Sequence, residues 1–271
     1  MPKPPEPKAS KFNWALAGRV ILWTGICGGL AFGSIAVESF LSNDPRFVLR
    51  CDPRAAGGSQ SLAASCTGIE IHGAVHSNMA RVLGVFAQDV GKSVFEIPLA
   101  ERRRHLLAVD WVREASVMRV WPDRISITLE ERVPVAFASL PIGGSARHWL
   151  ALIDEQGVLL TLPSRTRFPL PVLSGITEDQ SEPERQKRVD AMQHLLADLG
   201  PQAKEISEIN AAAVEDIRVV TAIDGHAVEL WLGDQHFRSR YLNFMNHYRE
   251  LRRDSDAAVF DLRLDDRILV R

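Results

Sequence analysis

The sequence has few of the residues from which metal and catalytic sites are built. Its 271 residues include only three cysteines, and no two of them have the C-x-x-C spacing of a metal or redox site. No G-x-S-x-G, H-E-x-x-H or P-loop motif is present. His72 and His76 are four residues apart, but Gly73 interrupts the helical face that a metal pair needs. We therefore expect no enzymatic activity, no metal and no cofactor.

A large excess of charge of one sign is also absent. The formal net charge is −2 at pH 7, so the chain lacks the excess of basic residues that is typical of nucleic-acid-binding proteins. Asp261, Asp265 and Asp266 are close in the sequence. A straight strand would nevertheless hold Asp261 and Asp265 too far apart to cooperate, so paired acid–base chemistry is unsupported.

One long uncharged run is present near the start of the chain. Residues 20–37 carry no charge, and a helix of that length rises about 27 Å, close to the thickness of the hydrocarbon core of a bilayer. We expect a cytoplasmic tail over residues 1–13 and a transmembrane helix over 14–40. Residues 1–37 include four basic residues and one acidic residue, which predicts export of everything after the helix. A cleaved signal peptide and a buried globular helix are the alternatives.

Cys51 and Cys66 lie on either side of a Gly/Ser-rich segment, in a predicted linker over residues 41–66. If the chain is exported, both cysteines face an oxidising compartment and can pair. Such a disulfide would stabilise the fold by roughly 3 kcal/mol. The alternative is two unpaired thiols beside a flexible linker, and the sequence leaves the choice open.

Residues 67–131 have the pattern of a small α/β module of order β-α-(short β)-α-β-β. A strand containing Ile69 and Ile71 ends at Gly73, and Ser77 is a plausible N-cap for the first helix. A short apolar stretch over 93–97 precedes a second helix, which Pro98 opens. The expected inward positions are Met79, Val82, Leu83 and Phe86 in the first helix, and Leu99, Arg103, Leu106 and Leu107 in the second. The basic run over 101–105 is interpreted as a solvated face.

The module closes with a predicted hairpin. Val112–Val120 is rich in apolar and β-branched residues, and Trp121-Pro122-Asp123 interrupts it because proline has no N–H to donate. Ile125, Ile127 and Leu129 then alternate with polar residues, as in a half-buried strand.

Two strings in this region resemble a known family. The first is W-V-x-x-A-x-V-x-R-x-W-P, starting at Trp111, and the second is E-R-x-P-V-A, starting at Glu131. Together with Gly91-Lys92-Ser93-Val94-Phe95, they resemble the POTRA domain of the FtsQ (DivIB) family of bacterial division proteins. The resemblance implies a POTRA domain over 67–134, a hinge at 131–134, and an FtsQ-type β-domain over 135–271.

The β-domain is expected to be mixed, with two helices. Strands are predicted over 149–154, 158–162, 217–220 and 228–232, and residues 168–175 (FPLPVLSG) again resemble the family. A capping box at Ser181 and Glu184 starts the first helix. Asp234 is a candidate cap for the second. The apolar stripe of the first helix is expected to be Val189, Met192, Leu196 and Leu199. The apolar stripe of the second helix is expected to be Phe237, Tyr241, Phe244, Tyr248 and Leu251. The solvent-exposed side of the second helix is expected to carry Arg238, Arg240, Arg249, Arg252 and Arg253.

The chain ends in strand-forming residues, and FDLRLD over 260–265 matches the closing motif of the family. The resemblance implies an exposed sheet edge that accepts a strand from FtsB, a mode of binding known as β-augmentation. The residues expected to contact FtsB are Arg263, Leu264, Ile268, Leu269 and Val270. Leu264 departs from the family, in which many relatives have an aromatic residue at this position.

The whole chain is therefore expected to be an α+β, single-pass type II protein of the inner membrane at the division septum, with most of its mass in the periplasm. The resemblance implies a scaffold that binds FtsB and FtsL, meets other divisome proteins through the POTRA domain, and helps control septal peptidoglycan synthesis. Two alternatives are a POTRA-bearing component of outer-membrane protein export and a membrane-tethered hydrolase.

Overall fold

A computed structural model describes residues 14–51, 66–143, 147–163, 166–254, 257–264 and 267–271. The chain divides into two compact units. The first includes residues up to His72, Leu83–Arg103 and Ser116–Thr128. The second includes Gly73–Val82, Arg104–Ala115 and Leu129–Arg271. The predicted domain boundary at 134/135 stays a prediction.

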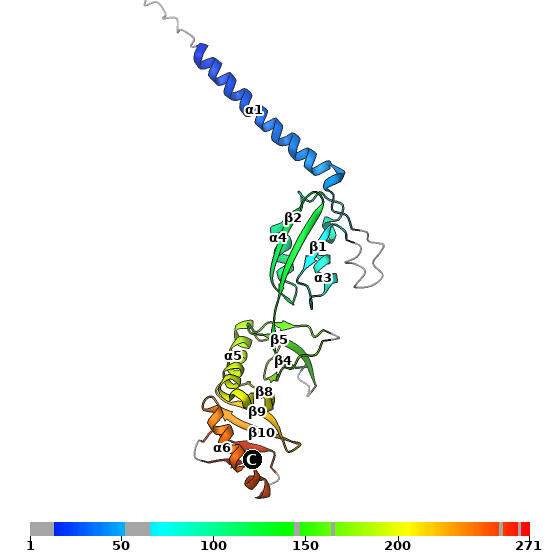
Figure 1. The fold of residues 1–271 in the computed structure, drawn as a ribbon. Helices are drawn as coiled ribbons and strands as arrows, with labels where there is room; N and C mark the ends of the chain where they lie inside the picture. Colours follow the sequence, from blue (N-terminus) through cyan, green and yellow to red (C-terminus); the bar gives the residue numbers. More distant parts are fainter. Residues whose placement is uncertain (1–13, 52–65, 144–146, 164–165, 255–256, 265–266) are drawn as a thin grey trace, which may run out of the picture. The chain divides into compact units, whose positions relative to one another are not determined.

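The first unit begins with the long helix α1, Trp14–Asn43 (Figure 1). Within it, Leu22–Asn43 is long and apolar enough to cross a membrane. Its large apolar side chains, including Leu22, Leu30 and Phe32, are exposed rather than packed in a core. That exposure is typical of a helix that lipid surrounds, because an apolar surface of this size is unfavourable in water. α1 extends three residues beyond the predicted end at Phe40.

The α/β module contributes residues to both units and contains a three-stranded sheet of order β1-β3-β2. Its elements are β1 Ile69–His72, α3 Met79–Gly84, η3 Ala87–Asp89, α4 Leu99–Leu107, β2 Val112–Val120 and β3 Arg124–Glu131. The predicted hairpin is confirmed, and Ile125, Ile127 and Leu129 are buried as expected. β1 pairs with β3 in parallel, with Ile69 opposite Ile125.

Two local predictions in this module are wrong. The expected short strand over 93–97 is only an isolated bridge between Ser93 and Val48. The cap of α3 is Asn78 rather than Ser77, because the side-chain oxygen of Asn78 accepts hydrogen bonds from the backbone N–H groups of Ala80 and Arg81 at 3.0 and 3.3 Å.

The helix α4 also departs from the predicted pattern. Leu107 and Arg103 were expected on the inner face but are exposed, whereas Arg102, from the supposedly solvated run, is buried. The cause is Asp89, whose side chain is fully buried and therefore needs a cationic partner. Arg102 donates to both oxygens of Asp89, at 2.5 and 3.0 Å.

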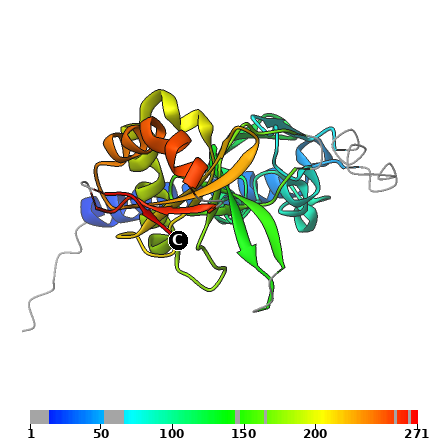
Figure 2. The same ribbon diagram turned by 90° about the horizontal axis from the view of Figure 1, so that it is seen from below.

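The second unit contains a nine-stranded sheet of order β12-β11-β10-β9-β8-β7-β4-β5-β6. The strands are β4 Pro134–Pro141, β5 His148–Asp154, β6 Leu159–Leu160, β7 Val172–Ser174, β8 Ile206–Asn210, β9 Ile217–Ile223, β10 His226–Gly233, β11 Val259–Asp261 and β12 Leu269–Val270. The helices α5 (Glu182–Leu199) and α6 (Phe237–Asp254) cover one face of this sheet (Figure 2).

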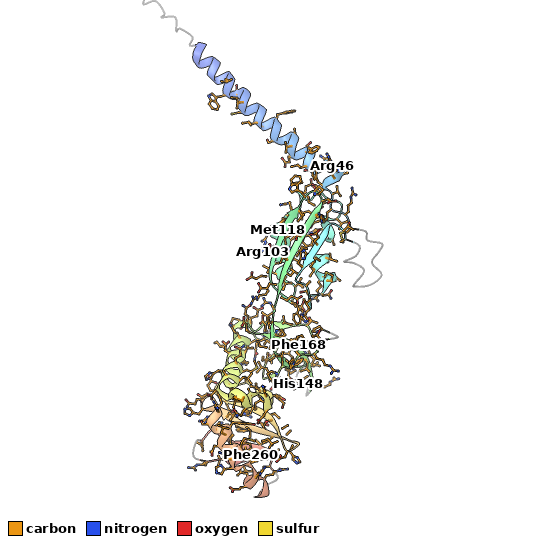
Figure 3. The ribbon with its side chains drawn as sticks, viewed as in Figure 1. Arg46, Arg103, Met118, His148, Phe168 and Phe260 are labelled. Carbon is orange, nitrogen blue, oxygen red and sulfur yellow. A yellow bond between two sulfur atoms is a disulfide. The ribbon has the colours of Figure 1, made fainter. Side chains whose placement is uncertain are left out.

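The core of this unit lies between the sheet and the two helices. The predicted aromatic stripe of α6 is confirmed, since Phe237, Tyr241, Phe244 and Tyr248 are buried. Phe244 packs on Phe260 of β11 with ring centroids 5.0 Å apart (Figure 3 labels Phe260). In α5, Val189, Met192 and Leu199 are buried as expected, but Leu195 is buried more deeply than Leu196.

The predicted capping box is confirmed at the start of α5, where the Glu184 carboxylate accepts a hydrogen bond from the backbone N–H of Ser181 at 2.9 Å. Two expectations about α6 are wrong. Asp234 lies too far from the first helical residue, Phe237, to be its N-cap. Arg240 is buried rather than on the wet side, because its guanidinium donates to the Leu232 carbonyl at 2.6 Å.

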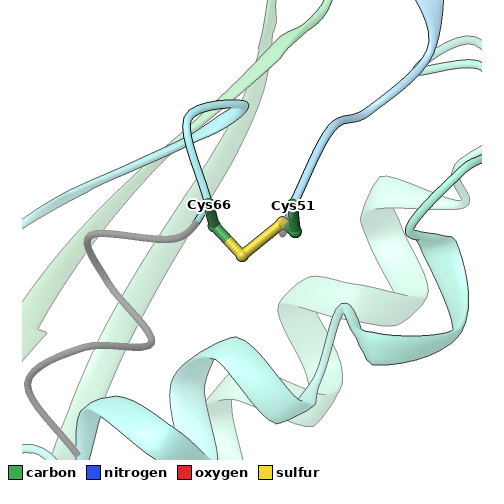
Figure 4. Close-up of a disulfide and its surroundings, with 2 residues drawn as sticks. All are labelled: Cys51 and Cys66. Carbon is green, nitrogen blue, oxygen red and sulfur yellow. A yellow bond between two sulfur atoms is a disulfide. The ribbon is translucent and has the colours of Figure 1, made fainter. Parts of the chain in front are cut away.

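Cys51 and Cys66 are joined by a disulfide, which is the first of the two alternatives that the sequence left open (Figure 4). Their Cα atoms are 3.9 Å apart, and 15 positions separate them in the sequence. Cys27, in α1, is free and exposed.

The buried ion pair yields a stability prediction. Arg102→Ala leaves the Asp89 carboxylate buried without its partner, and we expect a loss of about 3–5 kcal/mol in the free energy of unfolding. Arg104→Ala, at an exposed position of the same helix, should cost less than about 0.5 kcal/mol. Urea unfolding of the full-length protein in detergent, followed by circular dichroism, measures both. Equal losses would contradict a structural role for the pair.

The disulfide yields a second prediction. When the oxidised protein is denatured without reductant, a maleimide reagent should modify one thiol, that of Cys27, and after reduction it should modify three. Cys27→Ser is the control, for which no thiol should react before reduction. Three reactive thiols in the unreduced protein would show that Cys51 and Cys66 are not paired.

Candidate partner-binding edge

The last two strands form one edge of the nine-stranded sheet. β12 is antiparallel to β11, with Val270 opposite Phe260 and Leu269 opposite Asp261. Among the described residues, no strand pairs with the other side of β12. The N–H of Arg271 donates to the Val259 carbonyl at 3.1 Å. Arg271 and Val259 are therefore a hydrogen-bonded pair. Because hydrogen-bonded and non-hydrogen-bonded pairs alternate in an antiparallel ladder, the backbone groups of Leu269 also face β11, whereas those of Val270 face the open edge.

The five residues predicted to contact a partner have different surroundings. Leu264, Leu269 and Val270 are large apolar residues that remain 40–49% exposed. Ile268 is partly buried and packs against the core of the unit. Leu264 and Ile268 also line a hollow of about 450 Å³ beside the start of α6, together with residues such as His236 and Asn243. The edge therefore offers free backbone groups, exposed apolar side chains and an adjoining hollow.

The sheet face opposite the helices carries an arginine cluster around Trp231, which the sequence analysis missed. In the sheet register, Trp231 of β10 lies between Arg218 of β9 and Asp261 of β11. Residues directly opposite one another in a sheet point to the same face. The guanidinium carbons of Arg218, Arg271 and Arg263 lie 3.9, 4.2 and 5.0 Å from the Trp231 ring centroid. These distances are within the range of cation–π attraction.

Carboxylates bind the same arginines together. Asp261, which is buried, accepts hydrogen bonds from Arg263 Nε at 2.8 Å and Nη2 at 2.6 Å and from Arg271 Nη2 at 3.0 Å. Asp216 accepts from Arg218 at 2.8 Å and from Arg263 at 3.4 Å. The cluster is thus a network of opposite charges rather than a bare basic patch. It ties the segments that follow β11 and β12 to the centre of the sheet.

The network shifts the pKa of Asp261. The hydrogen bonds from the Arg263 side chain lower this pKa the most, and burial raises it. The Arg263 backbone N–H and the charges of Arg263 and Arg271 lower the pKa further, so that it lies at about 2. Asp261 is therefore ionised at every pH at which the protein is expected to work. In the sequence, the alternation in FDLRLD and the outward position of Trp231 in β10 were signals that could have identified the cluster.

The residues predicted to form a hinge are held by polar contacts within the second unit. The Glu131 carboxylate accepts hydrogen bonds from the backbone N–H groups of Val75, His76 and Ser77 at 2.7–2.9 Å. Burial raises the pKa of Glu131, but the hydrogen bond from the Ser77 side chain and those from the three backbone N–H groups outweigh burial, and the pKa lies below its usual value. Arg132 donates to Asp154 at 2.7 Å.

The indole of Trp111, the residue just before β2, supports the same region. Trp111 Nε1 donates to the Thr161 carbonyl at 2.9 Å. The Trp111 ring stacks on His76 at 4.8 Å and lies 6.4 Å from Phe168, which Figure 3 labels. In the part of the chain that the structure describes, no group of His, Cys, Asp and Glu could hold a metal ion. His76 instead lies 3.1 Å from Glu131.

The pKa of Asp261 predicts a pH dependence. Because its folded pKa of about 2 lies below the usual aspartate value of 3.8, the carboxylate contributes stability above about pH 4, and this contribution is lost as the pH falls toward 2. The difference in unfolding free energy between the wild type and Asp261→Asn should therefore shrink by about 1 kcal/mol between pH 6 and pH 3. Denaturant unfolding at both pH values measures it. A difference that does not change with pH would contradict the ion network.

Several known proteins are similar to this chain. Residues 65–132 match the family model described as "POTRA domain, FtsQ-type". The chain is 32% identical over 213 residues to "Cell division protein FtsQ" of Koribacter versatilis, an alignment that covers 76% of this chain and 60% of that protein. It is 24% identical to the protein of the same name from Geobacter sp., over 99% of this chain and 93% of that one. It is also 28% identical to that of Nitrosospira multiformis, over 61% and 62% of the two chains.

The chain thus spans about three fifths of the Koribacter and Nitrosospira proteins and nearly all of the Geobacter protein. The structure agrees with these similarities, because it combines one apolar N-terminal helix, the POTRA module and a β-rich C-terminal region. Over residues 65–132 the chain has a POTRA domain of the FtsQ type, and over most of its length it is similar to proteins named cell division protein FtsQ.

Proposed function

We propose that this protein is a single-pass membrane scaffold of bacterial cell division that works by binding other division proteins, without catalysis of its own. Its relatives are cell division proteins by name. The observation that carries the proposal is the open edge at β12, where Val270 faces no other strand in the part of the chain that the structure describes.

The proposed topology places the start of the chain in the cytoplasm and the rest in the periplasm, at the division septum of the inner membrane. Four basic residues and one acidic residue among residues 1–37 support this orientation. The disulfide between Cys51 and Cys66 also supports it, because disulfides persist in the periplasm and are rare in the cytosol. The POTRA domain would meet other divisome proteins.

The proposed partner at the edge is FtsB, and through it FtsL, so that the scaffold helps control septal peptidoglycan synthesis. A strand of FtsB would pair with β12 and extend the nine-stranded sheet. Backbone hydrogen bonds would then supply affinity, and the exposed side chains of Leu264, Leu269 and Val270 would supply specificity. The Asp261–Arg263–Arg271 network keeps β12 in place for this pairing.

The register selects the residue at which to test this pairing. A proline at Leu269 would remove an N–H that faces β11 and so damage β12 itself. A proline at Val270 removes an N–H that faces the open edge. Val270→Pro should weaken FtsB binding about tenfold, which corresponds to about 1.4 kcal/mol. Co-purification and titration of the full-length protein with FtsB and FtsL measure this.

Val270→Ala is the matched control, because it shortens the same side chain and keeps the N–H. It should weaken binding much less than Val270→Pro. If the Val270→Pro protein is folded, as judged by its thermal unfolding, and binds FtsB as tightly as the wild type, strand addition at β12 is wrong.

A further inference from the structure

The segment that follows α1 is bonded to the loop that precedes α4, within the first unit. The N–H of Leu49 donates to the Lys92 carbonyl at 2.9 Å, and the N–H of Val94 donates to the Phe47 carbonyl at 2.8 Å. The hydroxyl of Ser93 donates to the carbonyl of Leu41, in the last turns of α1, at 2.7 Å. Residues 47–49 are therefore held on this loop by an isolated antiparallel bridge and its flanking hydrogen bonds, and do not form a free linker.

An aromatic cluster lies at this junction. Phe47 is in edge contact with Phe40, Phe95 and Trp121, with ring centroids 6.0, 5.5 and 5.4 Å apart. Phe95 and Trp121 also contact each other, at 4.8 Å. We call these four residues the junction cluster. Phe47 is buried, but Phe40 is 50% exposed and Trp121 is 60% exposed.

A purely structural role does not account for this exposure. Trp121 is in the turn between β2 and β3, where its packing on Phe47 and Phe95 still leaves more than half of it exposed. Tryptophan and phenylalanine with one buried and one exposed side are typical of the interface between lipid and water. Two exposed cations, Arg46 and Lys92, lie beside the cluster in the sequence, Arg46 paired with Asp44 and Lys92 near Asp89.

The chain length fixes where the cluster can be. Phe47 follows Asn43, the last residue of α1, by four positions, which span at most about 14 Å. The headgroup layer on each side of a bilayer is about 5–8 Å thick. If α1 crosses the membrane, the cluster therefore cannot lie far from the headgroups.

From these observations, we propose that the junction cluster is a lipid-binding surface. Trp121 and Phe40 insert at the interface of the same membrane that α1 crosses, and so seat the adjoining tip of the POTRA module on the bilayer. This inference rests on the proposed transmembrane role of α1, so the test must separate the two.

Quenching of tryptophan fluorescence by brominated phospholipid can test the junction cluster separately from α1. The full-length protein is reconstituted into phosphatidylethanolamine–phosphatidylglycerol vesicles, with or without lipid that is brominated near the headgroup end of its acyl chains. Trp121→Phe keeps an aromatic ring in the cluster and should reduce the lipid-dependent quenching. Trp149→Phe, which removes another exposed indole, from β5, should leave it unchanged.

Trp23→Phe reports separately on α1, where Trp23 is exposed, and should also reduce the quenching. If Trp23→Phe lowers the quenching but Trp121→Phe does not, α1 is inserted and the lipid-binding role of the cluster is wrong. If neither substitution lowers it, both the anchor and the cluster proposal are overturned. Equal thermal unfolding of the Trp121→Phe and wild-type proteins shows that the fold is retained.

Discussion

The open edge of β12, where no strand among the described residues pairs with Val270, is the constraint on which this end of the sheet depends. Exposed sheet edges invite unwanted strand pairing, so proteins usually shorten, charge or cover them. Here the edge strand has two residues, Leu269 and Val270. A strand this short contributes few ladder hydrogen bonds. Its position must therefore be fixed by side chains, and the contacts of Asp261 with Arg263 and Arg271 do this.

The same arrangement explains why the end of the sheet contains so many charges that are not free to bind a partner. Three arginines lie within 5.0 Å of the Trp231 ring centroid, and they stay together because Asp216 and Asp261 lie among them. On the face of the sheet that the helices cover, Phe260 packs on Phe244 of α6. β11 is thus fixed from both sides, and β12 is left with one satisfied edge and one open edge.

Much of this architecture could be predicted from the sequence, because periodicity and turn residues report on local structure. The β2–β3 hairpin, the capping box at Ser181 and the aromatic stripe of α6 followed directly from the pattern. The failures involve long-range pairs. Arg102 and Arg240 were assigned to the surface because a sequence does not show that Asp89 or the Leu232 carbonyl is buried beside them. The cluster around Trp231 was missed for the same reason, since its members come from four separate segments.

The central claim is that β12 is completed by a strand of FtsB. Amide hydrogen exchange of valine-labelled and leucine-labelled full-length protein, measured by NMR with and without FtsB, tests it most directly. The Leu269 N–H, which faces β11, should be protected in both states. The Val270 N–H should exchange rapidly alone and become protected when FtsB binds. If FtsB binds and exchange at Val270 stays fast, the partner does not pair with this edge.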